Sequence, residues 1–144
     1  MRQRIPNTEQ NQVSGMKAET SPQQITVFYD GTCPLCRREI SVYKRCKGAE
    51  QIRWNDISQI DKKDVAPGLS KSEAMARFHV IDTTGQLRSG AAAFLVVWRS
   101  LPSFRVLGHL QRVNGAVSVL EWVYLGFLKL RPMMQSVLSR LDRN

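Results

Sequence analysis

The amino-acid sequence predicts an α/β fold with a small central sheet, flanking helices and a helical C-terminal extension. A β-branched and aromatic run at residues 25–29 is typical of a strand, and a turn pair, Asp-Gly, ends it. Pro34 suits the first turn of a helix and Gly48 suits its end, so we expect a helix at about 34–47. A strand followed directly by a helix, and then by further strand signals, indicates an α/β arrangement.

The next part of the chain continues this alternation. Apolar and polar residues alternate at 52–56 and predict a second strand, followed by a loop rich in turn residues. We then expect a short helix and a hairpin whose strands lie at 77–82 and 87–89. A further helix is predicted at 90–102.

The C-terminal part has apolar residues at helical spacing, in one stripe from Gly115 to Leu130 and another from Pro132 to Leu141. Its densest portion, VSVLEWVYLGFLKL, is interrupted by Glu121 and Lys129. This run falls short of the ~18–20 apolar residues that a bilayer-spanning helix needs, so we predict no transmembrane segment. We expect the portion to pack on the sheet, and contact with a membrane surface is the alternative.

Length and composition indicate one folded domain. The chain has 144 residues, 42% hydrophobic and 23% charged, which is the ordinary globular range. Residues 1–23 are too poor in apolar side chains to form a core, so we expect a disordered tail ahead of a single domain at 24–144. The N-terminus lacks an apolar export segment, and three cysteines cannot form a multiply disulfide-bonded framework. We therefore expect a cytoplasmic protein.

The chain is strongly basic, with 21 Lys and Arg residues against 12 Asp and Glu and a formal net charge of +9. Such a charge is compatible with nucleic acid, an anionic membrane surface or an acidic protein as partner. The basic residues are spread from Arg2 to Arg143 rather than gathered in one block. We interpret them as a solvated basic surface and expect no nucleic-acid partner.

The segment FYDGTCPLC, residues 28–36, contains two cysteines separated by two residues. Cys33 would lie at the N-terminus of the predicted helix, where free N–H groups and a dipole equivalent to about +0.5 charge stabilise a thiolate. The thiolate is the form that attacks a disulfide, so Cys33 is the expected nucleophile. Cys36 is near enough to resolve the mixed disulfide, and an external reductant must then reduce the resulting pair. In this context the pair is typical of a thioredoxin-like redox motif.

Other residues near the motif have two interpretations each. Asp30 could accept a proton from Cys36 during resolution, or it could simply hold the turn, as Asp-Gly pairs commonly do. Glu39 either faces the site or forms a surface ion pair, and we interpret the two arginines after Cys36 as exposed helix residues. Cys46 is turned by about 280° from Cys36 around the helix and is expected to lie away from the site.

The stretch FYDGTCPLCRREI resembles the signature of the DCC family of predicted thiol-disulfide oxidoreductases, which is named for one Asp and two Cys, here Asp30, Cys33 and Cys36. The likeness continues in RWNDIS, ARFHV and SGAAAFLVVWRSLP and covers about residues 24–141. It implies a thioredoxin-like fold and dithiol–disulfide exchange with a protein or small-molecule thiol. Thioredoxins also place a cis-proline before the strand that faces the CxxC, where it helps to dock the substrate. Residues 74–77 contain no proline, so docking of that kind is not predicted.

Three other functions are weighed against the redox one. YDGT is similar to the first motif of haloacid-dehalogenase phosphatases, but Phe28 stands where that chemistry needs a carboxylate nucleophile. A zinc module needs four ligands, and only His79 and His109 could join the cysteine pair. A non-enzymatic binding or membrane-surface adaptor would use the basic surface and the apolar C-terminal helices. We predict neither a metal nor a cofactor.

Overall fold

The central sheet of the computed structural model, which describes residues 24–141, has four strands in the order β2-β1-β5-β6. The strands are β1 (Thr26–Tyr29), β2 (Arg53–Asp56), β5 (His79–Ile81) and β6 (Leu87–Ser89). β1 pairs in parallel with β2 and antiparallel with β5, which pairs antiparallel with β6. β1 is therefore an inner strand, and its C-terminal end leads into the CxxC segment.

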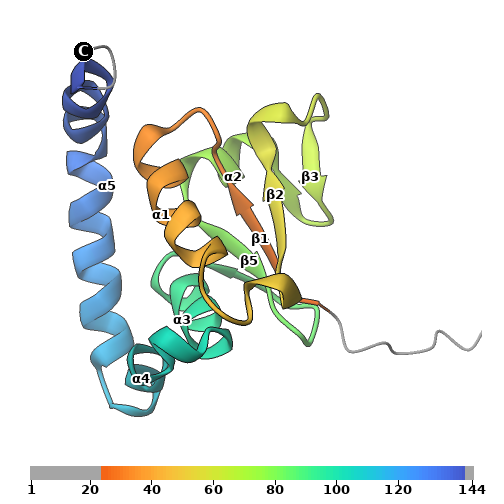
Figure 1. Ribbon diagram of the computed structural model, residues 1–144, viewed down its shortest axis with the longest axis vertical. Coiled ribbons are helices and arrows are strands. Elements are labelled where there is room, and N and C mark those ends of the chain that lie inside the picture. Colours follow the sequence, from red (N-terminus) through yellow and green to blue (C-terminus); the bar gives the residue numbers. More distant parts are fainter. Residues whose placement is uncertain (1–23, 142–144) are drawn as a thin grey trace, which may run out of the picture.

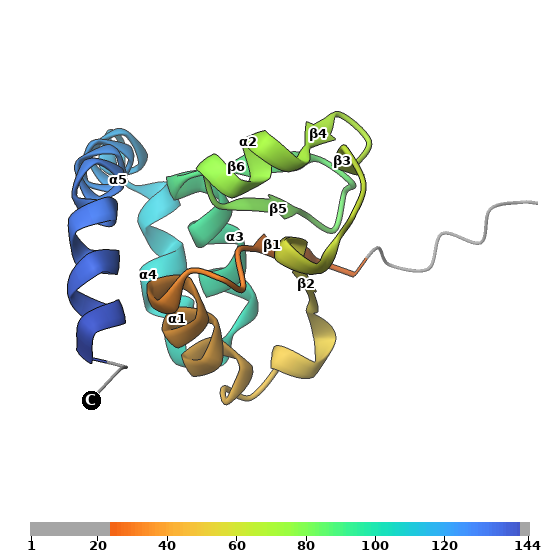
Figure 2. The same cartoon turned by 90° about the horizontal axis from the view of Figure 1, so that it is seen from above.

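Helices cover both faces of this sheet (Figures 1 and 2). They are α1 (Pro34–Lys44), α2 (Lys71–Ala76), α3 (Ala91–Ser100), α4 (Arg105–Gly108) and α5 (Ala116–Leu141). Short 3-10 helices lie at Ala49–Gln51, Ile57–Gln59, Pro102–Phe104 and His109–Arg112. The predicted mixed α/β, thioredoxin-like fold class is confirmed.

The core has two parts because successive side chains of a strand point to opposite faces. Val27 of β1 and Val80 of β5 are fully buried in a cluster that includes Tyr43 of α1 and Val97 of α3. Phe28, the next residue of β1, is buried in the other cluster, against α2. Phe28, which stands where the phosphatase chemistry would need a carboxylate nucleophile, is thus a core side chain.

Two parts of the chain differ from the sequence-based predictions. The segment predicted as a loop after β2 contains a two-stranded sheet of β3 (Asp64–Ala66) and β4 (Leu69–Ser70). Helix α1 ends at Lys44 rather than near residue 47. Residues 1–23, predicted to be a disordered tail, lie outside the described residues.

The C-terminal helix is the largest departure. The two predicted stripes form one helix, α5, which continues through Pro132. Proline lacks the N–H of a helical hydrogen bond and bends a helix, and the two views show α5 changing direction in its C-terminal part (Figures 1 and 2). The prediction that this segment packs on the sheet is wrong, because its main contacts are with α1 and α3. It lies on the side of these helices that faces away from the sheet.

The hydropathy of these helices bears on the membrane alternative. Within residues 24–141, no single helix is long and apolar enough to cross a membrane. The helical segments Pro102–Arg112 and Ala116–Leu141 satisfy the combined condition on length and hydropathy only as a pair, and the pair is bent by 114°.

Candidate active site

The loop that carries the CxxC is held by one carboxylate from each of the two parallel strands. Asp30 Oδ1, just after β1, accepts hydrogen bonds from the N–H (2.9 Å) and the hydroxyl (2.6 Å) of Thr32. Asp56 Oδ1, at the end of β2, accepts the N–H of Gly31 at 3.0 Å. A Cβ atom on Gly31 would lie 1.9 Å from a carboxylate oxygen of Asp56, so the close approach requires glycine. These bonds hold the turn that places Cys33 at the N-terminus of α1.

Cys33 is the N-cap residue of α1, at the helix N-terminus as predicted. Its Sγ accepts the backbone N–H of Cys36 at 3.3 Å and the side-chain N–H of Gln135 at 3.0 Å. The hydrogen bond from the Cys36 thiol, followed by the Cys36 backbone N–H and the Gln135 amide, lowers the pKa of Cys33 to about 4 against the opposing effect of burial. The side chain is therefore a thiolate at neutral pH.

Cys36 has the opposite character. Its hydrogen bond to Cys33, and then its burial, raise the pKa of the Cys36 thiol well above the ordinary value, and the charge of Arg131 partly offsets this. Both cysteines are free, with Cys33 only 2% exposed and Cys36 half-buried. The site thus pairs a thiolate at the helix N-terminus with a neighbouring protonated thiol.

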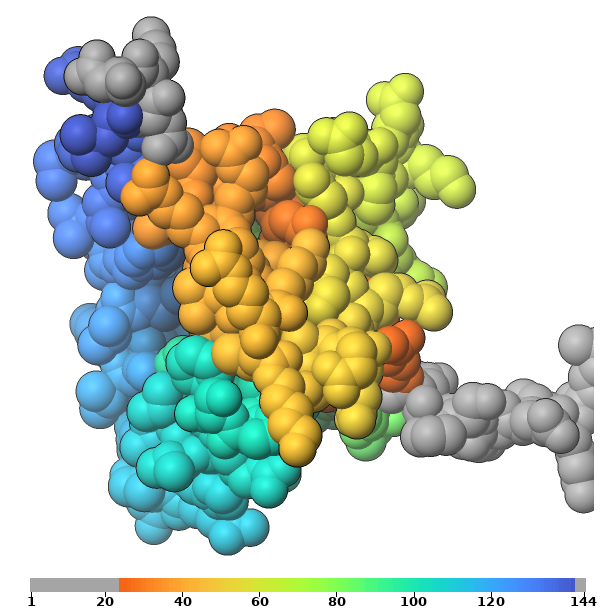
Figure 3. Space-filling model, in the orientation of Figure 1, coloured from red at the N-terminus to blue at the C-terminus, as the bar shows by residue number. Residues whose placement is uncertain are grey.

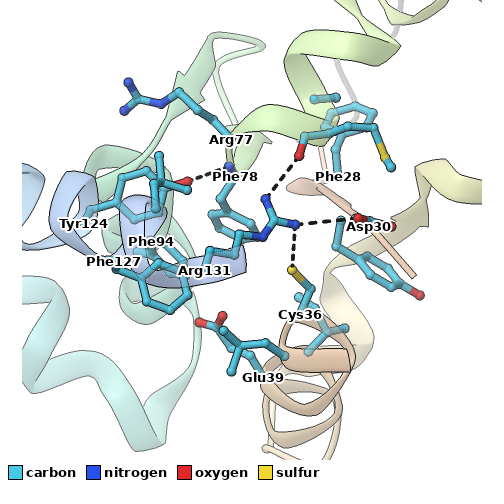
Figure 4. A pocket seen from close by; sticks show the side chains of 16 residues that line it. Phe28, Asp30, Cys36, Glu39, Arg77, Phe78, Phe94, Tyr124, Phe127 and Arg131 are labelled. Carbon is cyan, nitrogen blue, oxygen red and sulfur yellow. Dashed lines mark hydrogen bonds and ion pairs between the residues drawn. The ribbon is translucent and has the colours of Figure 1, made fainter. Parts of the chain in front are cut away.

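Two residues of α5, Arg131 and Gln135, complete the site, and sequence reasoning missed both. The Arg131 guanidinium lies between three groups: Nη2 is 3.4 Å from Cys36 Sγ and 3.6 Å from Asp30 Oδ2, and Nη1 donates to the Met75 carbonyl at 3.2 Å (Figure 4). Gln135 follows one helical turn later and reaches Cys33. The i,i+4 spacing of these residues in α5 was a visible but unspecific signal.

Side chains of α5 also bind the backbone of the segment that precedes β5. The Tyr124 hydroxyl accepts the backbone N–H of Phe78 at 2.8 Å, and Arg131 binds the carbonyl of Met75. Two backbone groups of this segment, the Met75 carbonyl and the Phe78 N–H, are thus bonded to side chains of α5.

Glu39 faces the site rather than forming a surface ion pair. With Cys36, Asp30 and Arg131, its side chain lines a cavity of about 40 Å³ that is otherwise mainly apolar (Figure 4). The carboxylate accepts the Tyr43 hydroxyl at 2.8 Å, and burial raises the pKa of Glu39. The cavity that Cys36 lines therefore contains a second carboxyl group besides Asp30.

The remaining predicted residues lie elsewhere. Cys46 is directed to the carbonyl of Val42 at 3.3 Å, away from the CxxC. The side chains of Arg37 and Arg38 are exposed.

The histidines weighed for a zinc site are also apart from the cysteines. His79 is buried with Nδ1 2.9 Å from the Arg77 carbonyl, while His109 is exposed. Across residues 24–141, His, Cys, Asp and Glu side chains form no group of three or more that could hold a metal ion.

A CxxC that opens the helix after an inner strand of this sheet defines a thioredoxin-like dithiol protein. Residues 27–137 match the family of DCC1-like thiol-disulfide oxidoreductases, and the chain belongs to that family. Among curated proteins, it is similar to the uncharacterized protein At5g50100, chloroplastic, of Arabidopsis thaliana, with 34% identity over 82 residues. That match covers 54% of this chain and 38% of the relative, so the chain spans well under half of the relative's length. No solved structure matches the chain.

Proposed function

We propose that this protein is a thiol-disulfide oxidoreductase in which Cys33 is the nucleophile and Cys36 is the resolving thiol. One observation carries the proposal: the Cys33 sulfur caps α1 and accepts hydrogen bonds from Cys36 and Gln135, which lower its pKa to about 4. A sulfur held in this way is an anion at neutral pH, and the anion is the attacking species in disulfide exchange.

The reaction has two exchange steps. The Cys33 thiolate attacks one sulfur of a substrate disulfide, the substrate S–S bond breaks, and the other substrate sulfur leaves as a thiolate. Cys36 then gives up its proton and attacks Cys33 Sγ, which breaks the mixed disulfide and releases the second substrate thiolate. Two electrons have passed to the substrate and a Cys33–Cys36 disulfide remains. An external thiol reductant returns the pair to the dithiol form.

The second step needs a proton acceptor, because the pKa of Cys36 is raised. We assign this role to Asp30, as the sequence suggested. The Arg131 guanidinium approaches both the Asp30 carboxylate (3.6 Å) and Cys36 Sγ (3.4 Å), which supports the assignment. The same cation stabilises the Cys36 thiolate once the proton has left. Asp30 also holds Thr32, so its two oxygens serve the turn and the site respectively.

Access to Cys33 requires a movement of α5. Cys33 is 2% exposed and Gln135 lies against its sulfur. The part of α5 after Pro132 is a weakly held cover, because the apolar side chains of Met133, Val137 and Leu141 are largely exposed rather than packed. In this proposal the substrate, a protein or small-molecule disulfide, reaches Cys33 when this part of the helix swings aside. A cytoplasmic location, expected from the sequence, belongs to the same proposal.

Trapping of the mixed disulfide tests the order of the two cysteines. A Cys36→Ser variant treated with an aromatic disulfide should retain one half of the reagent on Cys33, as mass spectrometry would show. A Cys33→Ser variant should be modified far more slowly, and Cys46→Ser should behave like the parent protein. Equal trapping on Cys36 in the Cys33→Ser variant would reverse the assignment.

A further inference from the structure

Helix α5 exposes a row of apolar side chains on the side that faces away from the rest of the protein. We call it the outer face of α5, made of Val119, Trp122, Val123, Leu130, Met133, Val137 and Leu141. Apart from the neighbours Trp122 and Val123, these residues recur at intervals of three, four or seven, so they follow one side of the helix. Trp122 is 78% exposed and Val119 is 64% exposed. The bend near Pro132 divides this face into a longer part that ends at Leu130 and a shorter part that begins at Met133.

The opposite side of α5 is the one that packs on the domain. Tyr124 is buried there, and Glu121, Arg131 and Gln135 make their hydrogen bonds on that side. Since α5 forms one edge of the molecule (Figures 1 and 3), no other described element covers its outer face. Contiguous exposed apolar surface of this kind marks an interaction site in soluble proteins.

The charges around the outer face are almost all positive. Exposed cations lie on α5 and on the two helical elements just before it. They are Arg105 in α4, Arg112 in the adjoining 3-10 helix, and Lys129 and Arg140 in α5. Between residues 102 and 141 the sequence has a single carboxylate, Glu121. It is turned inward, where it pairs with Arg77 and accepts the N–H of Ala91 at 2.9 Å.

We propose that the outer face of α5 binds the surface of an anionic lipid bilayer, with its apolar side chains in the boundary between headgroups and acyl chains. A helix with a long apolar strip, a tryptophan and flanking cations has the composition of helices that lie in the membrane plane. The cations would contact anionic headgroups, each adding to the affinity.

The charge pattern favours an anionic bilayer over a second copy of the chain as the partner of the outer face. Two copies joined through their outer faces would bring the same cations together, and like charges facing each other are unfavourable. An anionic bilayer has the complementary charge. The test of this proposal does not depend on the redox chemistry, because Val119, Trp122 and Lys129 lie before Pro132, outside the part of α5 that covers Cys33.

Vesicle sedimentation with the full chain tests the proposal. The protein should sediment with vesicles of mixed phosphatidylcholine and phosphatidylglycerol, and much less with phosphatidylcholine alone. Added salt should weaken this binding, because salt screens exposed charges. The double variant Val119→Ser/Trp122→Ser loses the burial of two apolar side chains, so its affinity should fall roughly tenfold or more. Lys129→Glu should weaken binding without changing the apolar strip.

Matched controls keep the test decisive. Val42 of α1 is also an exposed valine, so Val42→Ser should bind vesicles like the parent, and circular dichroism should show that every variant is folded. Binding that ignores lipid charge, or that Val42→Ser also loses, would overturn the proposal. A parent protein that binds no vesicles would also overturn the proposal. This holds for a monomeric parent and equally for a dimer that the Val119→Ser/Trp122→Ser substitutions dissociate. Binding that resists alkaline carbonate would show insertion rather than surface contact and would also refute it.

Discussion

Replacement of Gln135 by alanine tests how α5 controls the reactive thiol. The change removes the group that lies against the Cys33 sulfur and one hydrogen-bond donor at 3.0 Å. A hydrogen bond to a charged group contributes about 1.5–3 kcal/mol, and one pKa unit corresponds to about 1.4 kcal/mol. The pKa of Cys33, about 4 in the parent, should therefore rise by about one to two units. The sulfur remains mostly a thiolate at neutral pH, while its cover is lost.

The pH dependence of alkylation measures both effects. Iodoacetamide reacts with the thiolate, so the rate at Cys33 falls as the pH drops through its pKa. In the Gln135→Ala variant this fall should occur at a higher pH than in the parent. On the neutral plateau, however, the variant should react faster because the reagent reaches the sulfur more easily. Mass spectrometry of the peptide that contains Cys33 separates its rate from those of Cys36 and Cys46.

Ser136→Ala is the matched control, because Ser136 neighbours Gln135 but its hydroxyl donates to the carbonyl of Pro132 at 3.0 Å. This variant should give the parent's profile. If Gln135→Ala alters neither the plateau nor the pH midpoint, or if Ser136→Ala alters them equally, Gln135 neither covers Cys33 nor stabilises its thiolate.

Three further substitutions probe the rest of the site. Arg131→Met removes the charge that lowers the pKa of Cys36, so mixed disulfides should persist longer and quenched-flow mass spectrometry should detect them. Asp30→Asn should slow the same resolving step most strongly near neutral pH, whereas a rate with the parent's pH profile would limit Asp30 to its role in the turn. Gly31→Ala places a Cβ atom 1.9 Å from the Asp56 carboxylate, so urea unfolding should show a loss of about 1–3 kcal/mol, and an unchanged midpoint would argue against this contact.

Local patterns were enough to predict the part of the fold that carries the cysteines. The β-branched run before Asp30 and the proline after Cys33 act over a few residues, and they correctly placed a strand, a turn and a helix N-terminus. The position of Cys33 as the N-cap follows from these neighbours. The core role of Phe28 was equally accessible, because it lies in an apolar run.

The contributions of α5 could not be predicted in this way. Arg131 and Gln135 lie 95 and 102 residues from the sulfurs that they contact, and one sequence holds no local signal for such contacts. Pro132 suggested a break, but contacts with α1 and α3 hold the residues on both sides of it in one helix. The strands β3 and β4 have three and two residues, too few for a period-two pattern to stand out.

A redox titration of the purified protein tests whether Cys33 and Cys36 act together as a redox pair. The protein is equilibrated with thiol buffers over a range of potentials, alkylated, and analysed by mass spectrometry for the state of each cysteine. We expect Cys33 and Cys36 to convert together between a dithiol and an intramolecular disulfide in one two-electron transition, with Cys46 alkylated throughout. A protein in which Cys33 and Cys36 form no disulfide with each other at any potential would contradict this expectation.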